Sequence, residues 1–110
     1  MAEAKTQLFD NDLQELAQLF KALAHPARLQ ILSFLASQNA CFSGDITEEI
    51  PLGRTTVNQH LSELKKVGLV QGIVRGSKTN YCLDNKAIEL LEKSGIEFLS
   101  KLNKSNCNDC

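Results

Sequence analysis

The spacing of apolar residues changes along this chain, and the change restricts the structures that it can form. From Phe9 to Leu23 the apolar residues recur at steps of four and three, which predicts one face of an amphipathic helix. Proline disfavours helical backbone at the preceding residue, so Pro26 ends that helix at His25 and suits the first turn of the next one. The first part of the chain is therefore predicted to form two consecutive helices, the second reaching about residue 37.

A second pair of helices is predicted to follow, joined by a tight turn. Ser43-Gly44-Asp45 can cap a short helix over about residues 45–49, which Pro51 and Gly53 end. A new apolar stripe begins at Val57 and stops at Gly68, a residue type favoured just past a helix C-terminus. A short helix, a turn of about four residues and a longer helix make a helix-turn-helix.

Beyond Gly68 the pattern is that of strands. Segments 69–75 and 79–83 are strand-like and are separated by a glycine-containing basic turn at 76–78, which predicts a β-hairpin. A last amphipathic helix spans about residues 85–102. The predicted fold is mainly α with a small β-hairpin, in the order ααααββα. We expect a flexible N-terminus over 1–7, one domain over 8–102 and a cysteine-containing tail over 103–110.

Length and cysteine content limit the class of protein. A chain of 110 residues is one domain, and it buries only about 60–65% of its unfolded surface, which makes pairing with a second copy a natural source of stability. No apolar run approaches the roughly 18 residues of a membrane span, and the first residues lack the features of a signal peptide. We therefore expect a cytoplasmic protein without a membrane partner, whose four cysteines are thiols or metal ligands before disulfides.

The charge of the chain is unevenly distributed. Twelve basic and thirteen acidic residues give a net charge of -1, which alone argues against nucleic acid. Between Arg54 and Asn80, however, five basic residues accompany one acidic residue, so this segment carries +4 and the remainder -5. A solvated basic face would also explain the charge, but its coincidence with a helix-turn-helix and a hairpin favours phosphate binding.

The longer helix of the predicted helix-turn-helix is rich in hydrogen-bonding side chains away from its apolar stripe. Threonine and asparagine are weak helix formers, so their use on an exposed face indicates contact with a partner. Arginine can pair with guanine, and asparagine or glutamine with adenine. Two alternatives stay open: Thr56 can bond within the first helical turn, and His60 can be a polar packing residue at the edge of the core.

Two stretches resemble the ArsR/SmtB family of winged-helix repressors. FKALAHPARL at residues 20–29 resembles the family's LKALAHPxRLxIL, and LGRTTVNQHL at 52–61 resembles its recognition helix, often LSQxTVSxHL. Gly68-Leu69-Val70 and the hairpin from Gly76 to Tyr81 resemble its wing, so the likeness covers about residues 8–102.

This resemblance implies a homodimeric repressor, paired through its first and last helices, that binds double-stranded DNA at an inverted repeat and releases it when an effector binds. Gly53 stands where a serine cap is frequent, and Asn58 replaces a common serine. The DNA-binding residues implied are Arg54, Thr55, Thr56, Asn58, Gln59 and His60 in the recognition helix, with Arg75 and Lys78 in the wing.

The cysteines are the candidates for the effector site, and no resident cofactor is expected. Zinc and cobalt sensors of the family often use histidine on the last helix, whereas no histidine follows His60 here. Soft-metal sensors often carry Cys-x-Cys where this chain has Cys41-Phe42-Ser43. Cys107 and Cys110 are spaced to bind one ion, so Cys41, Cys107 and Cys110 together form a candidate site for arsenite or another soft metal ion.

Other interpretations of the thiols remain. A disulfide or polysulfide between Cys41 and Cys107 would make the protein a redox or persulfide sensor, and the tail thiols can also be unconstrained. Cys82 is expected to face outwards from its strand without a ligand role. We do not expect an enzyme, because a thiol reductase using Cys107 and Cys110 would lack its βαβ context. A winged-helix module that binds protein is the last alternative.

Overall fold

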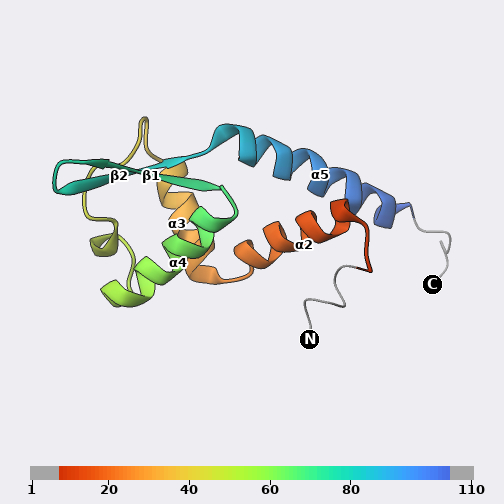
Figure 1. Ribbon diagram of the computed structural model, residues 1–110, viewed down its shortest axis with the longest axis horizontal. Helices are drawn as coiled ribbons and strands as arrows, with labels where there is room; N and C mark the ends of the chain where they lie inside the picture. Colours follow the sequence, from red (N-terminus) through yellow and green to blue (C-terminus); the bar gives the residue numbers. More distant parts are fainter. Residues whose placement is uncertain (1–7, 105–110) are drawn as a thin grey trace.

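The computed structural model describes residues 8–104. In these residues a helix-turn-helix is followed by a hairpin and a long last helix (Figure 1). The elements are α2 (Asn11–Leu23), α3 (Pro26–Ala36), the 3-10 turn η1 (Ile46–Glu48), α4 (Arg54–Lys66), β1 (Val70–Arg75), β2 (Lys78–Leu83) and α5 (Asn85–Asn103). This confirms the predicted winged helix-turn-helix. The expected N-terminal segment 1–7, Cys107 and Cys110 lie outside the described residues.

Local sequence signals set most helix starts. His25 has extended backbone and its ring nitrogen accepts a hydrogen bond from the Ala27 amide at 3.0 Å, directly before Pro26 begins α3. Asp84 caps α5 by accepting from the Ala87 amide at 3.1 Å. Gly53 precedes α4 and supplies no side-chain cap, as its departure from the family pattern predicts.

The predicted short helix over residues 45–49 is reduced to one 3-10 turn. Asp45 caps this turn by accepting from the Thr47 amide at 3.0 Å, and Glu49 already ends it. The sequence between Asp45 and Pro51 is too short for more than one turn of helix, because Pro51 and Gly53 follow at once.

Two glycines make the turns that position the wing. Gly68 has a φ of 81° directly after α4, and the Leu69 amide donates to the Leu64 carbonyl at 3.1 Å, which ends the helix and directs the chain into β1. Gly76 has a φ of 64°, and Arg75 pairs with Lys78 across a two-residue turn. Lys78 therefore belongs to the strand and not to the turn, and both basic residues lie at the hairpin tip.

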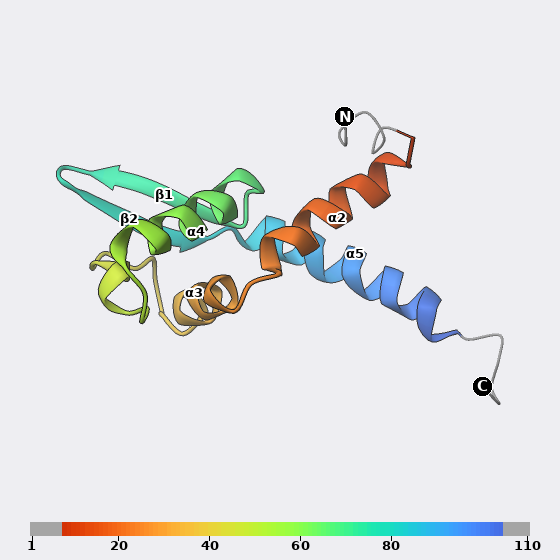
Figure 2. The same cartoon turned by 90° about the horizontal axis from the view of Figure 1, so that it is seen from below.

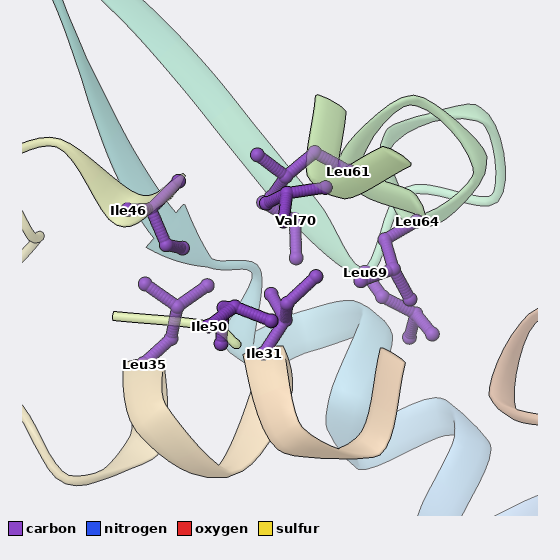
Figure 3. Close-up of a cluster of buried hydrophobic side chains, with 9 residues drawn as sticks. Ile31, Leu35, Ile46, Ile50, Leu61, Leu64, Leu69 and Val70 are labelled. Atoms are coloured by element: carbon purple, nitrogen blue, oxygen red, sulfur yellow. The ribbon is translucent and has the colours of Figure 1, made fainter. Parts of the chain in front are cut away.

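The hydrophobic core lies inside the winged helix-turn-helix, at the base of the wing (Figure 3). Helix α3 supplies one wall, and α4 with the start of β1 supplies the other. The buried cluster consists of Ile31, Leu35, Ile46, Ile50, Val57, Leu61, Leu64, Leu69 and Val70. This core fixes α4 by its apolar stripe and leaves the opposite face free.

Helices α2 and α5 cross each other and extend away from the hairpin, at the opposite end of the molecule (Figures 1 and 2). The Phe20 and Phe98 rings meet edge to face at 6.5 Å at this crossing. Much of the apolar surface of these two helices is exposed: Leu13, Phe20, Leu90, Ile96, Leu99 and Leu102.

The overall dimensions agree with this open arrangement. The radius of gyration is 16.7 Å, whereas a compact domain of this length has about 13 Å. Among residues 8–104, no helix combines the length and apolarity needed to cross a membrane.

Candidate nucleic-acid interface

Helix α4 turns one face to the core and the other to solvent. Val57, Leu61 and Leu64 are buried on the inner face. On the outer face, close to the N-terminus of the helix, the exposed residues are Arg54, Thr55, Thr56, Asn58 and Gln59. The N-terminal end of a helix carries partial positive charge and free amides, which favour a phosphate there.

The wing approaches the same end of α4. A hollow of about 400 Å³ separates the two elements, with Arg54 and Asn58 on one side and Ser77, Lys78 and Thr79 on the other. Arg75 is exposed beside Lys78 at the hairpin tip. Seven of the eight predicted DNA-binding residues are thus exposed on α4 or the wing, and Arg54, Asn58 and Lys78 line the same hollow.

Asp45 is the acidic neighbour of this region. Its carboxylate lies 2.8 Å from the Arg54 guanidinium and accepts a hydrogen bond from the Thr47 hydroxyl at 2.6 Å. The Thr47 hydroxyl and then Arg54 lower the pKa of the Asp45 carboxyl. In the free protein Arg54 is therefore paired, and a phosphate or base must compete with Asp45 for it.

His60 differs from the other predicted DNA-binding residues. Only 8% of its surface is exposed, its ring lies tilted by 46° against that of His25 with the ring centroids 4.3 Å apart, and its Nδ1 accepts a hydrogen bond from Arg28 Nε at 3.1 Å. Burial, followed by the neighbouring His25 and Arg28, lowers the pKa of His60. The side chain thus faces inwards, in the packing role that the sequence left open as an alternative.

Arg28 connects three helices. Besides its bond to His60 on α4, its guanidinium donates to the carbonyls of Lys21 at 3.2 Å and Ala22 at 3.3 Å, at the C-terminal end of α2. A cation at a helix C-terminus is favourable because free carbonyls carry partial negative charge there. Arg28 on α3 therefore fixes α4 relative to α2.

Cys41 and Cys82 form a disulfide, with their Cα atoms 4.5 Å apart. This corrects three expectations: two of the four cysteines form a disulfide and are neither thiols nor metal ligands, Cys82 has a partner, and Cys41 is bonded within residues 8–104 and not to the tail. The pairing follows from a contact that the sequence does not reveal, a two-residue β-bridge in which Phe42 and Tyr81 exchange amide-to-carbonyl bonds of 2.8 and 2.9 Å. The bridge places the residue before Phe42 beside the residue after Tyr81.

The proposed metal site falls largely outside the region that can be described. Of its three cysteines, only Cys41 lies within residues 8–104. Within that range, no three histidine, cysteine, aspartate or glutamate side chains are grouped to hold a metal ion.

Three residues that bear on this interface were missed or undervalued in the sequence. The sequence indicates only a capping role for Asp45, although its position nine residues before Arg54 also permits an ion pair across the turn. Arg28 gave no signal of its three bonds. The pairing of Cys82 with Cys41 depends on the bridge between the loop and β2, which has no signal in the sequence.

Comparison with known proteins identifies the family. Residues 25–71 match the model for "Bacterial regulatory protein, arsR family". The cadmium resistance transcriptional regulatory protein CadC of Listeria innocua is 30% identical over 95 residues, 86% of this chain and 80% of CadC.

Two solved structures extend the match to three dimensions. An ArsR-like transcriptional regulator from Rhodococcus is 30% identical with a TM-score of 0.60, covering 83% of this chain and 89% of that one. The homodimeric winged helix-turn-helix DNA-binding domain of Mb0332 from Mycobacterium bovis is 26% identical with a TM-score of 0.63, over 87% and 89%. The chain belongs to the ArsR family of bacterial transcriptional regulators.

Proposed function

We propose that the protein is a homodimeric repressor that binds an inverted-repeat operator and leaves it when an effector acts on its cysteines. The observation that carries the DNA-binding part is the convergence of the exposed polar face of α4 and the basic hairpin tip on one hollow. In this proposal Asn58 and Gln59 contact base edges, and Thr55 and Thr56 bond phosphates. The cations Arg54, Arg75 and Lys78 supply the charge that attracts the DNA backbone.

His60 has a different part in this proposal. Its buried ring, bonded to Arg28, keeps α4 in the orientation that presents Asn58 and Gln59. His60 thus acts on DNA affinity through the position of the helix.

Single substitutions test the DNA interface on duplex DNA from upstream of the protein's own gene. Arg54→Gln and Lys78→Gln should each weaken binding by about 5–150-fold, as expected for the loss of one charged contact worth about 1–3 kcal/mol. Lys93→Gln is the matched control, because Lys93 is exposed on α5, outside the interface. Equal loss in all three variants would contradict the interface.

The exposed apolar surface of α2 and α5 supports the dimer. Leu99 is 56% exposed although it belongs to the amphipathic stripe of α5, and Ile96 and Leu102 lie beside it. Burying such side chains against a second copy contributes about 25 cal/mol per Å² of apolar area. The homodimeric Mb0332 domain has the same fold, which makes this pairing the first choice.

A charged substitution tests the dimer. Leu99→Glu should convert the dimer to a monomer, so that light scattering measures the mass of one chain and not of two. The reason is that burying an unpaired carboxylate in the dimer interface is strongly unfavourable. Val74→Glu places the same charge on an apolar residue of the wing, 73% exposed, and should leave the mass at twice that of the chain. A dimeric Leu99→Glu protein would refute pairing through α5.

For the effector we propose arsenite or another soft metal ion at Cys41, Cys107 and Cys110 of the reduced protein, in which the Cys41–Cys82 bond is open and Cys41 is a free thiol. Thiolates suit such ions, and CadC by its name is a cadmium resistance regulator. Binding would change the relative setting of the two recognition helices, and a coupling of about 1–3 kcal/mol would weaken operator binding 5–150-fold. Redox or persulfide sensing through Cys41 and Cys107 is the alternative.

Titration of the reduced protein separates these effectors. Arsenite or cadmium should release the DNA from wild type but not from Cys41→Ser or Cys107→Ser if the three thiols bind the ion. Release by a persulfide donor or an oxidant with no response to either ion would favour the alternative instead.

A further inference from the structure

The disulfide lies where the wing meets the segment that leads into the helix-turn-helix. Cys41 precedes Phe42 in the loop after α3, and Cys82 follows Tyr81 in β2. The Phe42 ring in turn packs edge to face on Phe34 of α3 at 4.8 Å. The loop thus packs on α3 through Phe42, and the disulfide links the same loop covalently to β2 of the wing.

Without the bond, a weaker contact joins the loop to the wing at this point. The Phe42–Tyr81 bridge consists of two backbone hydrogen bonds, each worth about 0.5–1.5 kcal/mol in net terms. Tyr81 also lines the hollow opposite Arg54. The Cys41–Cys82 bond therefore adds a covalent link to the core contacts that position the wing beside α4 and the hollow.

The two sulfurs differ in access, which suggests how the bond forms. Cys41 is exposed and Cys82 is half-buried. The exposed thiolate is the one that a small oxidant reaches first, and the half-buried thiol beside it can then resolve the product.

We propose that Cys41 and Cys82 are a reversible thiol–disulfide site, oxidised by a hydroperoxide, and that the bond fixes the wing against the helix-turn-helix and strengthens DNA binding. The Cys41 thiolate attacks the hydroperoxide, its sulfur becomes a sulfenic acid and an alcohol leaves. The Cys82 thiol displaces water from that sulfur and the S–S bond forms. The two thiols give up two electrons and two protons, and the hydroperoxide is reduced to alcohol and water.

The direction of the effect follows from preorganisation. A wing that is already fixed loses less freedom when Arg75 and Lys78 engage the backbone of DNA, so less of the contact energy is lost to ordering. We expect the oxidised form to bind about three- to tenfold more tightly, the factor that roughly one ordered side chain or turn supplies. This regulation rests on the proposed DNA-binding function, whereas the chemistry of the thiol site does not.

The experiment uses the full chain with Cys107→Ser and Cys110→Ser, so that only the two thiols of the site remain. Cumene hydroperoxide should produce a Cys41–Cys82 crosslinked peptide in mass spectrometry. It should also slow hydrogen exchange at the Phe42 and Tyr81 amides, and a phosphine reductant should reverse both changes. Adding Cys41→Ser or Cys82→Ser should abolish both the crosslink and the change in hydrogen exchange. Each of these two variants keeps one thiol of the site, so they serve as controls for each other.

Affinity for the upstream duplex is then measured for both redox forms. Tighter binding of the oxidised form supports the proposal. Absence of the crosslink, unchanged exchange at Phe42 and Tyr81, or equal or weaker DNA affinity of the oxidised form each overturns it. If both forms bind DNA equally in a salt-dependent manner, the redox proposal fails and the DNA-binding function stands. If neither form binds DNA, the DNA-binding function fails as well, and with it the regulation proposed here.

Discussion

Replacement of Arg28 by leucine should loosen the connection between α2, α3 and α4. The substitution keeps the aliphatic part of the side chain and removes the guanidinium. His60 Nδ1 then loses its donor at 3.1 Å inside a nearly closed environment, and the Ala22 carbonyl loses a donor at 3.3 Å. The bond to the Lys21 carbonyl is exposed, so water can replace it.

The cost can be worked from these contacts. A hydrogen bond from a charged donor contributes about 1.5–3 kcal/mol when it is shielded, and a buried acceptor left without a donor costs about 1–3 kcal/mol. For His60 the lost hydrogen bond and the unsatisfied acceptor are the same energy counted in two ways, so only one of them is included. The partly exposed Ala22 carbonyl adds a smaller amount. We therefore expect Arg28→Leu to lower the free energy of unfolding by roughly 2–3 kcal/mol.

Urea unfolding at fixed protein concentration measures this change. With a slope of about 1–3 kcal/mol per molar urea, the midpoint should fall by about 0.7–3 M. Arg75→Leu is the matched control, because Arg75 is exposed at the hairpin tip and should shift stability by no more than about 0.5 kcal/mol. If Arg28→Leu and Arg75→Leu unfold at the same urea concentration, Arg28 does not hold the helices together and the reasoning is refuted.

Further predictions concern the neighbours of the interface. Asp45→Asn keeps a capping oxygen for Thr47 but frees Arg54, so DNA affinity should rise about three- to tenfold; unchanged affinity in a gel-shift titration would contradict this. Because the folded protein keeps the pKa of His60 below 6.5, the unfolded chain binds more protons in this window, and stability should fall as pH is lowered from about 6.5. His60→Gln should reduce that slope in urea titrations between pH 5 and 8 (roughly the titration range of histidine). The Cys41–Cys82 bond closes a loop of 41 residues, so its reduction should lower the free energy of unfolding by about 4 kcal/mol. Coincident urea unfolding curves for the oxidised and reduced proteins would contradict this prediction.

Periodicity made most of the fold predictable. The stripe from Val57 to Leu64 and the stop at Gly68 locate α4 because a helix buried on one side repeats its apolar residues every three or four positions. The hairpin followed from Gly76, whose positive φ makes the turn. Both signals come from residues close together in the chain, so they can be detected in a single sequence.

What could not be predicted depends on contacts between distant segments. Nothing near His60 indicates that Arg28, thirty-two residues earlier, donates to its ring and that the side chain faces inwards. Strand alternation predicted that Cys82 faces outwards, but a bridge between Phe42 and Tyr81 brings another loop to that side. In both cases the partner is set by how α3 and the wing pack, which spacing along the chain does not encode.

The most direct test of the account is the salt dependence of binding to the upstream duplex. Each phosphate contact contributes about 0.9 to the slope of log affinity against log salt. Removing three cations per protomer, six in a dimer, should therefore reduce a steep wild-type slope by about 5. The variant is Arg54→Gln, Arg75→Gln and Lys78→Gln, and the charge-matched control on α5 is Lys86→Gln, Lys93→Gln and Lys101→Gln. The account predicts a flattened slope and weak binding for the first protein alone; equal slopes for both proteins, or wild-type binding that does not respond to salt, would contradict it.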